Sequence, residues 1–166
     1  YFLFLTGTLP SPCLPPRDKN ILGRERECEK IIICSGFENT RLVSICGPPG
    51  FGKTLVAVAV RHELESMGLP VHIFSLRDFQ SKVDVTEMLL DFFRGTAPLC
   101  QTPPCSSIDE QIIQRLSVIS EQTVLVLDDA DRLLDNKDFL NFLQEVLSRA
   151  EQFKLIVTAK ESFKLR

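Results

Sequence analysis

The residues with the clearest chemical potential lie in one glycine-rich stretch, CGPPGFGKTL, at positions 46–55. Its spacing G-x-x-x-x-G-K-T runs from Gly47 to Thr54. Glycines let backbone N–H groups approach a phosphate chain closely, because they adopt dihedral angles that other residues avoid. In this pattern the lysine reaches the β- and γ-phosphates of a nucleotide, and the threonine hydroxyl binds Mg²⁺. The predicted phosphate-binding loop consists of Gly47, Gly50, Gly52, Lys53 and Thr54.

The elements on either side of this loop matter, since an ordinary strand–turn–helix with a surface lysine could match the same letters. RLVSIC at 41–46 is a short, mostly apolar run that ends at a glycine, which is typical of a buried strand. The segment from Lys53 to about Met67 is apolar on nearly every side over its first two turns, so we expect a helix sandwiched between other elements. Gly68 and Pro70 predict its end. A helix that opens at the loop adds its positive end to the phosphate site.

Two acidic residues follow the most strand-like run of the chain, TVLVL at 123–127. Mg²⁺ keeps most of its water and accepts only one or two carboxylate partners. We therefore expect Asp128 to bind Mg²⁺ together with Thr54, and Asp129 to orient or activate the attacking water. Alternatively, both aspartates cap the helix that follows, because Asp is a favoured N-cap residue.

A further strand, KLIVT at 154–158, ends in a polar residue. Thr158 is a candidate to hydrogen-bond the γ-phosphate or the attacking water. Lys160 lies two residues later and is a candidate to sense the γ-phosphate electrostatically, or else a solvated surface lysine. Neither His62 nor His72 is assigned any chemistry.

The remaining periodicity predicts a chain of alternating strands and helices. VHIFSL at 71–76 alternates like a strand, and helical spacing of apolar residues recurs at 24–35, 85–93, 108–119 and 139–150. Two of these helices have capping-box spacing, at Asp84 with Glu87 and at Ser107 with Glu110, and Val83 with Met88 suggests a hydrophobic staple.

Strands that alternate with helices imply βαβ units and a parallel sheet covered on both faces. Ligands of such sheets bind beyond the carboxyl ends of the strands, where all the candidates above fall. The expected fold is thus α/β, a three-layer P-loop NTPase sandwich with a mainly parallel sheet, incomplete at the C-terminus. We expect residues 1–17 to be a proline-rich linker or tail, and 18–166 to be a P-loop nucleotide-binding domain truncated after its fourth strand.

Composition sets limits on other functions. The 166 residues are 44% hydrophobic and have a net charge of −3, so no basic excess signals nucleic-acid binding. No run approaches the roughly 18 apolar residues that would span a membrane. The six cysteines form no C-x-x-C pair, and Cys34 and Cys46 lie in apolar runs where buried thiols are common. Reduced cysteines and a cytoplasmic location are the resulting expectation.

The order of motifs resembles one family over about residues 18–161. NILGRERE, GPPGFGKTLVAVAV, VHIFSLRD, TVLVLDDAD and FKLIVTAKES together are similar to the NB-ARC type of nucleotide-binding domain, in the STAND class of P-loop NTPases. The resemblance implies an ATP/ADP signalling switch with slow Mg²⁺-dependent hydrolysis, flanked by other domains of the same chain and forming a homo-oligomer on activation. It implies three groups of nucleotide contacts: Ile21, Leu22, Gly23 and Arg24 beside the adenine; Gly50, Gly52, Lys53, Thr54 and Leu55 at the phosphates; and Asp128 at magnesium with Thr158 and Lys160 as sensors.

Two features depart from that family. The sensor position usually carries arginine, whereas Lys160 offers a point charge without the bidentate fork. The fifth strand and the helical lid that close over ADP are expected beyond residue 166, so the 166 residues alone are expected to bind nucleotide weakly or not at all.

Other interpretations stay open. An AAA+ motor or loader ATPase would favour Asp-Glu after the third strand, where this chain has Asp128 and Asp129. A small-molecule or nucleoside kinase would need an arginine-rich lid, and residues 95–105 contain no arginine. A scaffold that binds nucleotide without hydrolysing it is a third alternative, and no motif distinguishes ATP from GTP.

Overall fold

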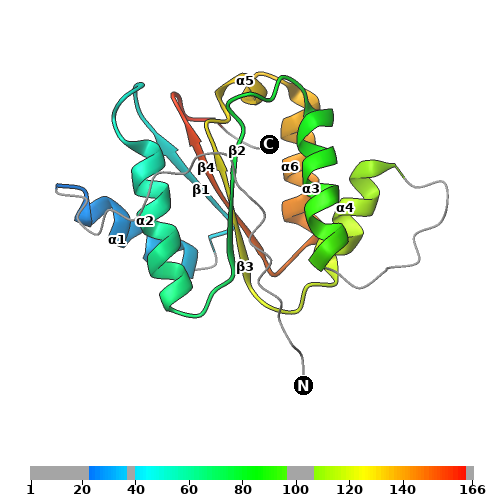
Figure 1. The fold of residues 1–166 in the computed structure, drawn as a ribbon, viewed down its shortest axis with the longest axis horizontal. Coiled ribbons are helices and arrows are strands. Elements are labelled where there is room, and N and C mark those ends of the chain that lie inside the picture. Colours follow the sequence, from blue (N-terminus) through cyan, green and yellow to red (C-terminus); the bar gives the residue numbers. More distant parts are fainter. Residues whose placement is uncertain (1–22, 37–39, 97–106, 164–166) are drawn as a thin grey trace.

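The computed structural model describes residues 23–36, 40–96 and 107–163. In this part of the chain four parallel strands form one sheet, in the order β1-β4-β3-β2, between two layers of helices (Figure 1). The strands are β1 (Leu42–Cys46), β2 (Val71–Ser75), β3 (Thr123–Asp128) and β4 (Phe153–Ala159). The expected three-layer α/β sandwich with a parallel sheet is confirmed, while the proline-rich segment at 1–17 lies outside the described residues.

The helices divide between the two faces of the sheet. On one face lie α1 (Glu25–Gly36) and α2 (Lys53–Ser66), and on the other lie α3 (Lys82–Thr96), α4 (Ile108–Ser117) and α6 (Lys137–Arg149) (Figure 1). A short helix, α5 (Asp131–Leu134), follows β3 at the carboxyl end of the sheet. As predicted, α2 is sandwiched, since it packs on both α1 and the strands.

The central strand β3 shows why TVLVL reads as one continuous apolar run. Val124 and Val126 belong to the core beneath α2, whereas Leu125 and Leu127 belong to the core beneath the opposite helices. Every residue of β3 is buried, because neighbouring strands flank it and helices cover both faces. This burial leaves Asp128, at the end of the strand, as a carboxylate inside the protein.

The helix starts confirm one predicted cap and correct another. Ser107 accepts the N–H of Glu110 at 3.2 Å, as its capping-box spacing predicts. The box predicted at Asp84 with Glu87 is wrong, because α3 starts one turn earlier. There Ser81 and Asp84 accept each other's backbone N–H groups, at 3.3 and 2.9 Å. Val83 is 54% exposed, so the predicted staple does not form either.

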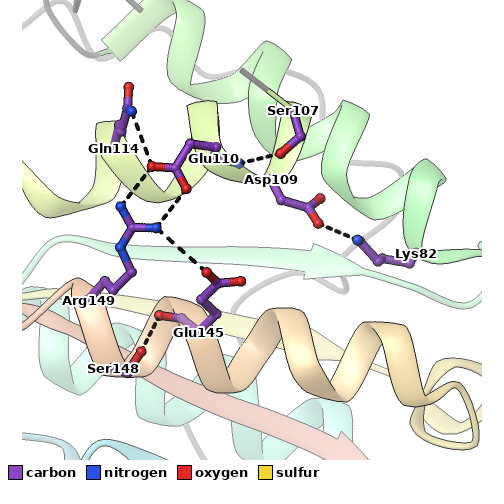
Figure 2. Close-up of polar contacts among 8 residues, drawn as sticks. All are labelled: Lys82, Ser107, Asp109, Glu110, Gln114, Glu145, Ser148 and Arg149. Carbon is purple, nitrogen blue, oxygen red and sulfur yellow. Dashed lines mark hydrogen bonds and ion pairs between the residues drawn. The ribbon is translucent and has the colours of Figure 1, made fainter. Parts of the chain in front are cut away.

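Charged side chains join the helices of one layer (Figure 2). The Arg149 guanidinium on α6 donates two parallel hydrogen bonds to the Glu110 carboxylate on α4, at 2.7 and 2.8 Å. This bidentate pair lowers the pKa of Glu110, with Arg149 as the main cause. Lys82 on α3 makes a single ion pair with Asp109 on α4, so α3, α4 and α6 are also joined by polar contacts at their surface.

The cysteine prediction needs correction at one position. Cys28, Cys34 and Cys46 are free thiols, but Cys46 is exposed and Cys34 is half-buried. Cys46 ends β1, the edge strand of the described sheet, and its side chain lies on the side where Ser44 is also exposed. The inference of a buried thiol from an apolar run was therefore wrong at Cys46, because an edge strand is less buried than a central one. None of the described helices is long and apolar enough to cross a membrane.

Arg41 joins the start of β1 to the far end of α6. Its guanidinium donates from Nε to the Phe153 carbonyl at 2.9 Å and from Nη2 to the Ala150 carbonyl, where the helix ends. A cation that bonds the last carbonyls of a helix also interacts favourably with the helix dipole. We expect Arg41→Ala to lower the free energy of unfolding by about 1–3 kcal/mol in urea titrations. The exposed Arg26→Ala serves as control, and equal stability of the two variants would contradict this role.

His72 makes stability depend on pH. Its ring stacks edge-on against Phe92 at 4.7 Å, and burial lowers its pKa below the usual 6.5. On acidification His72 therefore binds a proton in the unfolded chain at a higher pH than in the folded protein. The contribution of neutral His72 to the free energy of unfolding is complete above about pH 6.5 and declines on further acidification. We expect His72→Phe to lose less stability than the wild type between pH 7 and pH 5 in thermal melts. His62→Gln, on the surface of α2, should follow the wild type.

Candidate phosphate-binding site

The strand order brings three predicted site segments together at the carboxyl end of the sheet. Strand β4 lies between β1 and β3, and Thr158 pairs in register with Ile45 of β1. On its other side β4 runs beside β3, whose last residue is Asp128. The glycine-rich loop after β1, the acidic pair after β3 and the polar end of β4 are therefore neighbours.

The loop at 47–52 uses two of its glycines for backbone conformation. Gly50 and Gly52 have φ values of 81° and 75°, in the left-handed region that other residues rarely adopt. Gly52 is also the N-cap of α2, and no described side chain caps that helix. By contrast, Ser107 caps α4 and Asn136 caps α6. The first N–H groups of α2 thus stay available for an anion.

Lys53 places its charge over this loop. Its ammonium group donates to the Gly47 carbonyl at 2.8 Å and to the Pro48 carbonyl at 3.2 Å. These contacts hold Nζ against the start of the loop, while the Lys53 backbone begins α2. A phosphate group bound there would face both the ammonium charge and the helix N-terminus.

Two threonine hydroxyls meet at one buried carboxylate. Thr54 Oγ1 donates to both oxygens of Asp128, at 3.0 and 2.9 Å, and Thr158 Oγ1 donates to Oδ1 at 2.6 Å. Asp128 is only 3% exposed. A buried carboxylate is costly unless it is hydrogen-bonded or paired with a cation. Thr54 Oγ1 and Asp128 together present the hard oxygen ligands that suit Mg²⁺.

The site offers only a part of a metal's coordination shell. Within the described residues no cluster of three or more His, Cys, Asp or Glu side chains could hold a metal ion. Thr54 and Asp128 would supply one or two protein ligands, and water and phosphate oxygens would supply the others. That donor set fits Mg²⁺, which usually keeps several waters, better than a structural metal enclosed by protein.

Asp129 sits in a strained turn and has a partner that the sequence analysis missed. Its φ is 60°, and its N–H donates to Thr158 Oγ1 at 2.8 Å. Its carboxylate accepts a hydrogen bond from Arg77 Nε at 2.9 Å. Partial burial raises the pKa of Asp129, but hydrogen bonding with Arg77 and with Asp131, together with the charges of Arg77 and Lys53, outweighs it, so the pKa is lowered. Asp129 is therefore ionised at neutral pH.

The proposed capping role of the two aspartates is wrong. The N-cap of α5 is Ala130, and that helix has no side-chain cap hydrogen bond in the described structure. Asp128 instead bonds the threonines, and Asp129 bonds Arg77. Both acids are thus directed towards neighbouring strands and loops.

The remaining predicted site residues lie around the glycine-rich loop or outside the described part of the chain. Arg24 Nη2 donates to the Phe51 carbonyl at 3.4 Å, which brings the start of α1 to the loop, and Gly23 precedes it with φ 86°. Leu55, in the first turn of α2, is 42% exposed. Lys160 is exposed, while its backbone N–H bonds to the Asp131 carboxylate. Ile21 and Leu22 lie outside the described residues.

Two residues of this region were not predicted, Arg77 and Asp131. Both had a weak signal in the sequence. Arg77 is a charged residue just after the strand VHIFS, and Asp131 belongs to the run DDAD after TVLVL. Their partners are 52 and 29 residues away, so periodicity and spacing could not identify them.

Comparison with known proteins defines the class of this domain. The family described as an AAA domain matches residues 37–166. The chain therefore belongs to the AAA domain family, and its fold is that of a P-loop nucleotide-binding domain. No curated protein matches the chain.

Solved structures share the fold at low sequence identity. The Aeropyrum pernix Orc1 protein, solved in complex with DNA, has a TM-score of 0.65 and 18% identity, covering 87% of this chain and 40% of that one. Cdc6p from Pyrobaculum aerophilum has a TM-score of 0.61 and 17% identity, covering 91% and 42%. AMPPCP-bound DnaA from Aquifex aeolicus has a TM-score of 0.50 and 14% identity, covering 86% and 40%. The chain thus spans about two fifths of these proteins.

These findings favour one of the alternatives over the main sequence interpretation. They support an AAA-type domain and give no support to NB-ARC or STAND membership specifically. The Asp-Asp pair at 128–129 had counted against the AAA+ interpretation. That argument gave too much weight to one position, Asp129 in place of glutamate. The AAA domain match extends over residues 37–166 and outweighs it.

The loop glycines provide a matched test of the local geometry. Gly52 has φ 75°, so a side chain there is strained even though the nearest atom to its Cβ, in Leu55, is 3.9 Å away. Gly47 has an ordinary φ and a similar 3.9 Å clearance to Phe51. We expect Gly52→Ala to cost about 1–2 kcal/mol in chemical unfolding without nucleotide, and Gly47→Ala to cost less. Equal losses would mean that the left-handed conformation is not required.

Proposed function

We propose that this chain is the nucleotide-binding domain of an AAA+-type ATPase that binds ATP and ADP with Mg²⁺. One observation carries the proposal. The open N-terminus of α2, with Lys53 above it, lies beside the hydrogen-bonded group of Thr54, Asp128 and Thr158. Phosphate-binding donors and an oxygen ligand set for Mg²⁺ therefore occur at one place.

Each residue then has a defined task. The loop glycines Gly47, Gly50 and Gly52 and the first turn of α2, with Leu55, would hold the phosphates, and Lys53 would neutralise the β- and γ-phosphates. Thr54 and Asp128 would hold Mg²⁺, which would offset charge that develops on the transferred phosphoryl group. Arg24 contacts the loop at the Phe51 carbonyl, and with Ile21, Leu22 and Gly23 it would line the adenine side of the pocket.

Asp129 and the end of β4 would act on the reacting end of the nucleotide. The lowered pKa of Asp129 keeps its carboxylate ionised, as an acceptor for a hydrogen bond from the attacking water requires. Thr158 stands between Asp128 and the Asp129 N–H, so it couples the Mg²⁺ ligand to this acid. Lys160, two residues beyond, would sense the γ-phosphate by charge.

The similar structures support nucleotide binding, but they do not identify the partners of this chain. The Aquifex aeolicus DnaA structure contains AMPPCP, and the Aeropyrum pernix Orc1 structure contains DNA. The net charge of −3 over 166 residues is no direct signal of nucleic-acid binding. Nucleic acid stays open as a partner, because a local basic surface is compatible with that total.

The signalling switch implied by the NB-ARC resemblance is a narrower proposal on the same site. A switch would hold ADP and assemble into a homo-oligomer on exchange for ATP, with slow hydrolysis. A motor or loader would turn ATP over steadily. The two differ in turnover, and the assigned residues serve both.

Substitution of Lys53 tests the proposal in the full-length protein. We expect Lys53→Ala to weaken binding of a fluorescent ATP analogue at least about tenfold, or about 1.4 kcal/mol, and to abolish hydrolysis. We expect Asp129→Asn to keep binding and reduce hydrolysis by about tenfold or more. Lys137→Ala, exposed at the start of α6, is the control.

Each result separates the interpretations. Wild-type protein that binds neither ATP nor ADP, or Lys53→Ala that binds as well as the wild type, would refute the nucleotide site. Tight Lys53-dependent binding without hydrolysis would identify the non-hydrolysing scaffold.

A further inference from the structure

Three consecutive residues after β3 each hydrogen-bond to Thr158 at the end of β4 or to Lys160 just beyond it. The Asp129 N–H donates to Thr158 Oγ1 at 2.8 Å, and the Ala130 N–H donates to the Thr158 carbonyl at 3.1 Å. The Asp131 carboxylate then accepts the Lys160 N–H. The first two bonds use backbone donors of the turn. The third uses a side chain, so it depends on the residue type at 131.

The position of Asp131 points to this bond as its role. Asp131 is the first residue of α5, and that helix has Ala130 as its N-cap, with no side-chain cap hydrogen bond among the described residues. Its Oδ2 is buried and accepts no hydrogen bond in the described part of the chain. Burying an oxygen without a donor costs free energy. A compensating contact is the hydrogen bond that Oδ1 accepts from the Lys160 N–H, just beyond β4.

The turn held by these bonds is itself strained. Asp129 has φ 60°, an unfavourable conformation for a residue with a side chain. Such conformations persist when surrounding contacts over-determine them, and they cluster at functional sites. The three bonds to Thr158 and Lys160 supply that constraint at the strained residue and at the two residues after it. They also fix Thr158, whose hydroxyl is bonded to Asp128 and to the Asp129 N–H at once.

We propose that Asp131 is a positioning residue for the nucleotide site. Its carboxylate holds the Lys160 backbone, and thereby keeps the Thr158 hydroxyl and the Lys160 side chain in register with Asp128 and Asp129. Asp131 acts through Thr158 and Lys160 and has no contact with phosphate. Its effect on hydrolysis rests on the function proposed above, whereas the clamp itself is a property of the fold.

The geometry and the charge of Asp131 can be separated with two variants of the full-length protein. Asp131→Asn keeps an acceptor oxygen at the same place, and Asp131→Glu keeps the charge but moves the carboxylate by one methylene. We expect Asp131→Glu to lower the rate of ATP hydrolysis about tenfold, since small displacements at a reacting site are costly. Asp131→Asn should stay within about threefold of the wild type, and ATP affinity should change less than threefold in both. Equal losses in the two variants, or wild-type hydrolysis in Asp131→Glu, would overturn the proposal.

A double-mutant cycle tests whether Asp131 acts through Thr158. In a Thr158→Val background, Asp131→Glu should lower hydrolysis by less than about twofold, because coupled residues are not additive. A full and additive loss would mean that Asp131 acts by another route. Asp135→Glu is the matched control, since Asp135 is an exposed aspartate at the opposite end of α5.

Hydrogen exchange tests the clamp independently of ATP hydrolysis. In nucleotide-free protein, amides of the peptide at 158–162 should exchange slowly in the wild type and in Asp131→Asn, and about tenfold faster in Asp131→Glu. Unchanged exchange in Asp131→Glu would refute the clamp, even if hydrolysis fell. A wild type that hydrolyses no ATP would refute the proposed function, and the exchange result would still decide the role of Asp131.

Discussion

The structure depends on one buried charge, the Asp128 carboxylate at the end of the central strand. Its 3% exposure requires that its oxygens find donors inside the protein. Thr54 supplies one hydroxyl from the start of α2, and Thr158 supplies another from β4. Both donors are near only because β4 inserts between β1 and β3. The same arrangement joins the Asp128 carboxylate to Thr54 in the first turn of α2, a helix whose N-terminus has no side-chain cap.

The surrounding contacts keep this arrangement rigid. The sheet is covered on both faces, so its strand ends are held by two apolar cores (Figure 1). The bonds from residues 129–131 to β4 then stabilise a turn that is strained at Asp129. Arg77 reaches the same aspartate from the turn after the edge strand β2 and helps keep it ionised. Apolar packing thus determines where the site lies, and polar contacts between loops determine its geometry.

The match to the AAA domain family shows what local sequence motifs can and cannot predict. The loop at 47–54 and the apolar strand before Asp128 are local patterns, and they predicted a P-loop fold, which the AAA domain match supports. They could not separate NB-ARC from AAA membership, because both classes use them. The capping-box error at Asp84 has a related cause: two overlapping spacings competed, and only the contacts of Ser81 decided between them.

By itself, the sequence determined the strand–loop–helix around Lys53, the buried central strand and the position of the acidic pair, because each follows from neighbouring residues. Apolar periodicity and glycine conformation act over a few positions and need no distant partner. Only the tertiary structure decided the strand order, the Arg77–Asp129 pair and the bond between Asp131 and Lys160. Those contacts join residues 29 to 52 positions apart, and parallel strands can be ordered in several ways with the same local pattern. Long-range hydrogen bonds exist only after the sheet has formed, so no local spacing encodes them.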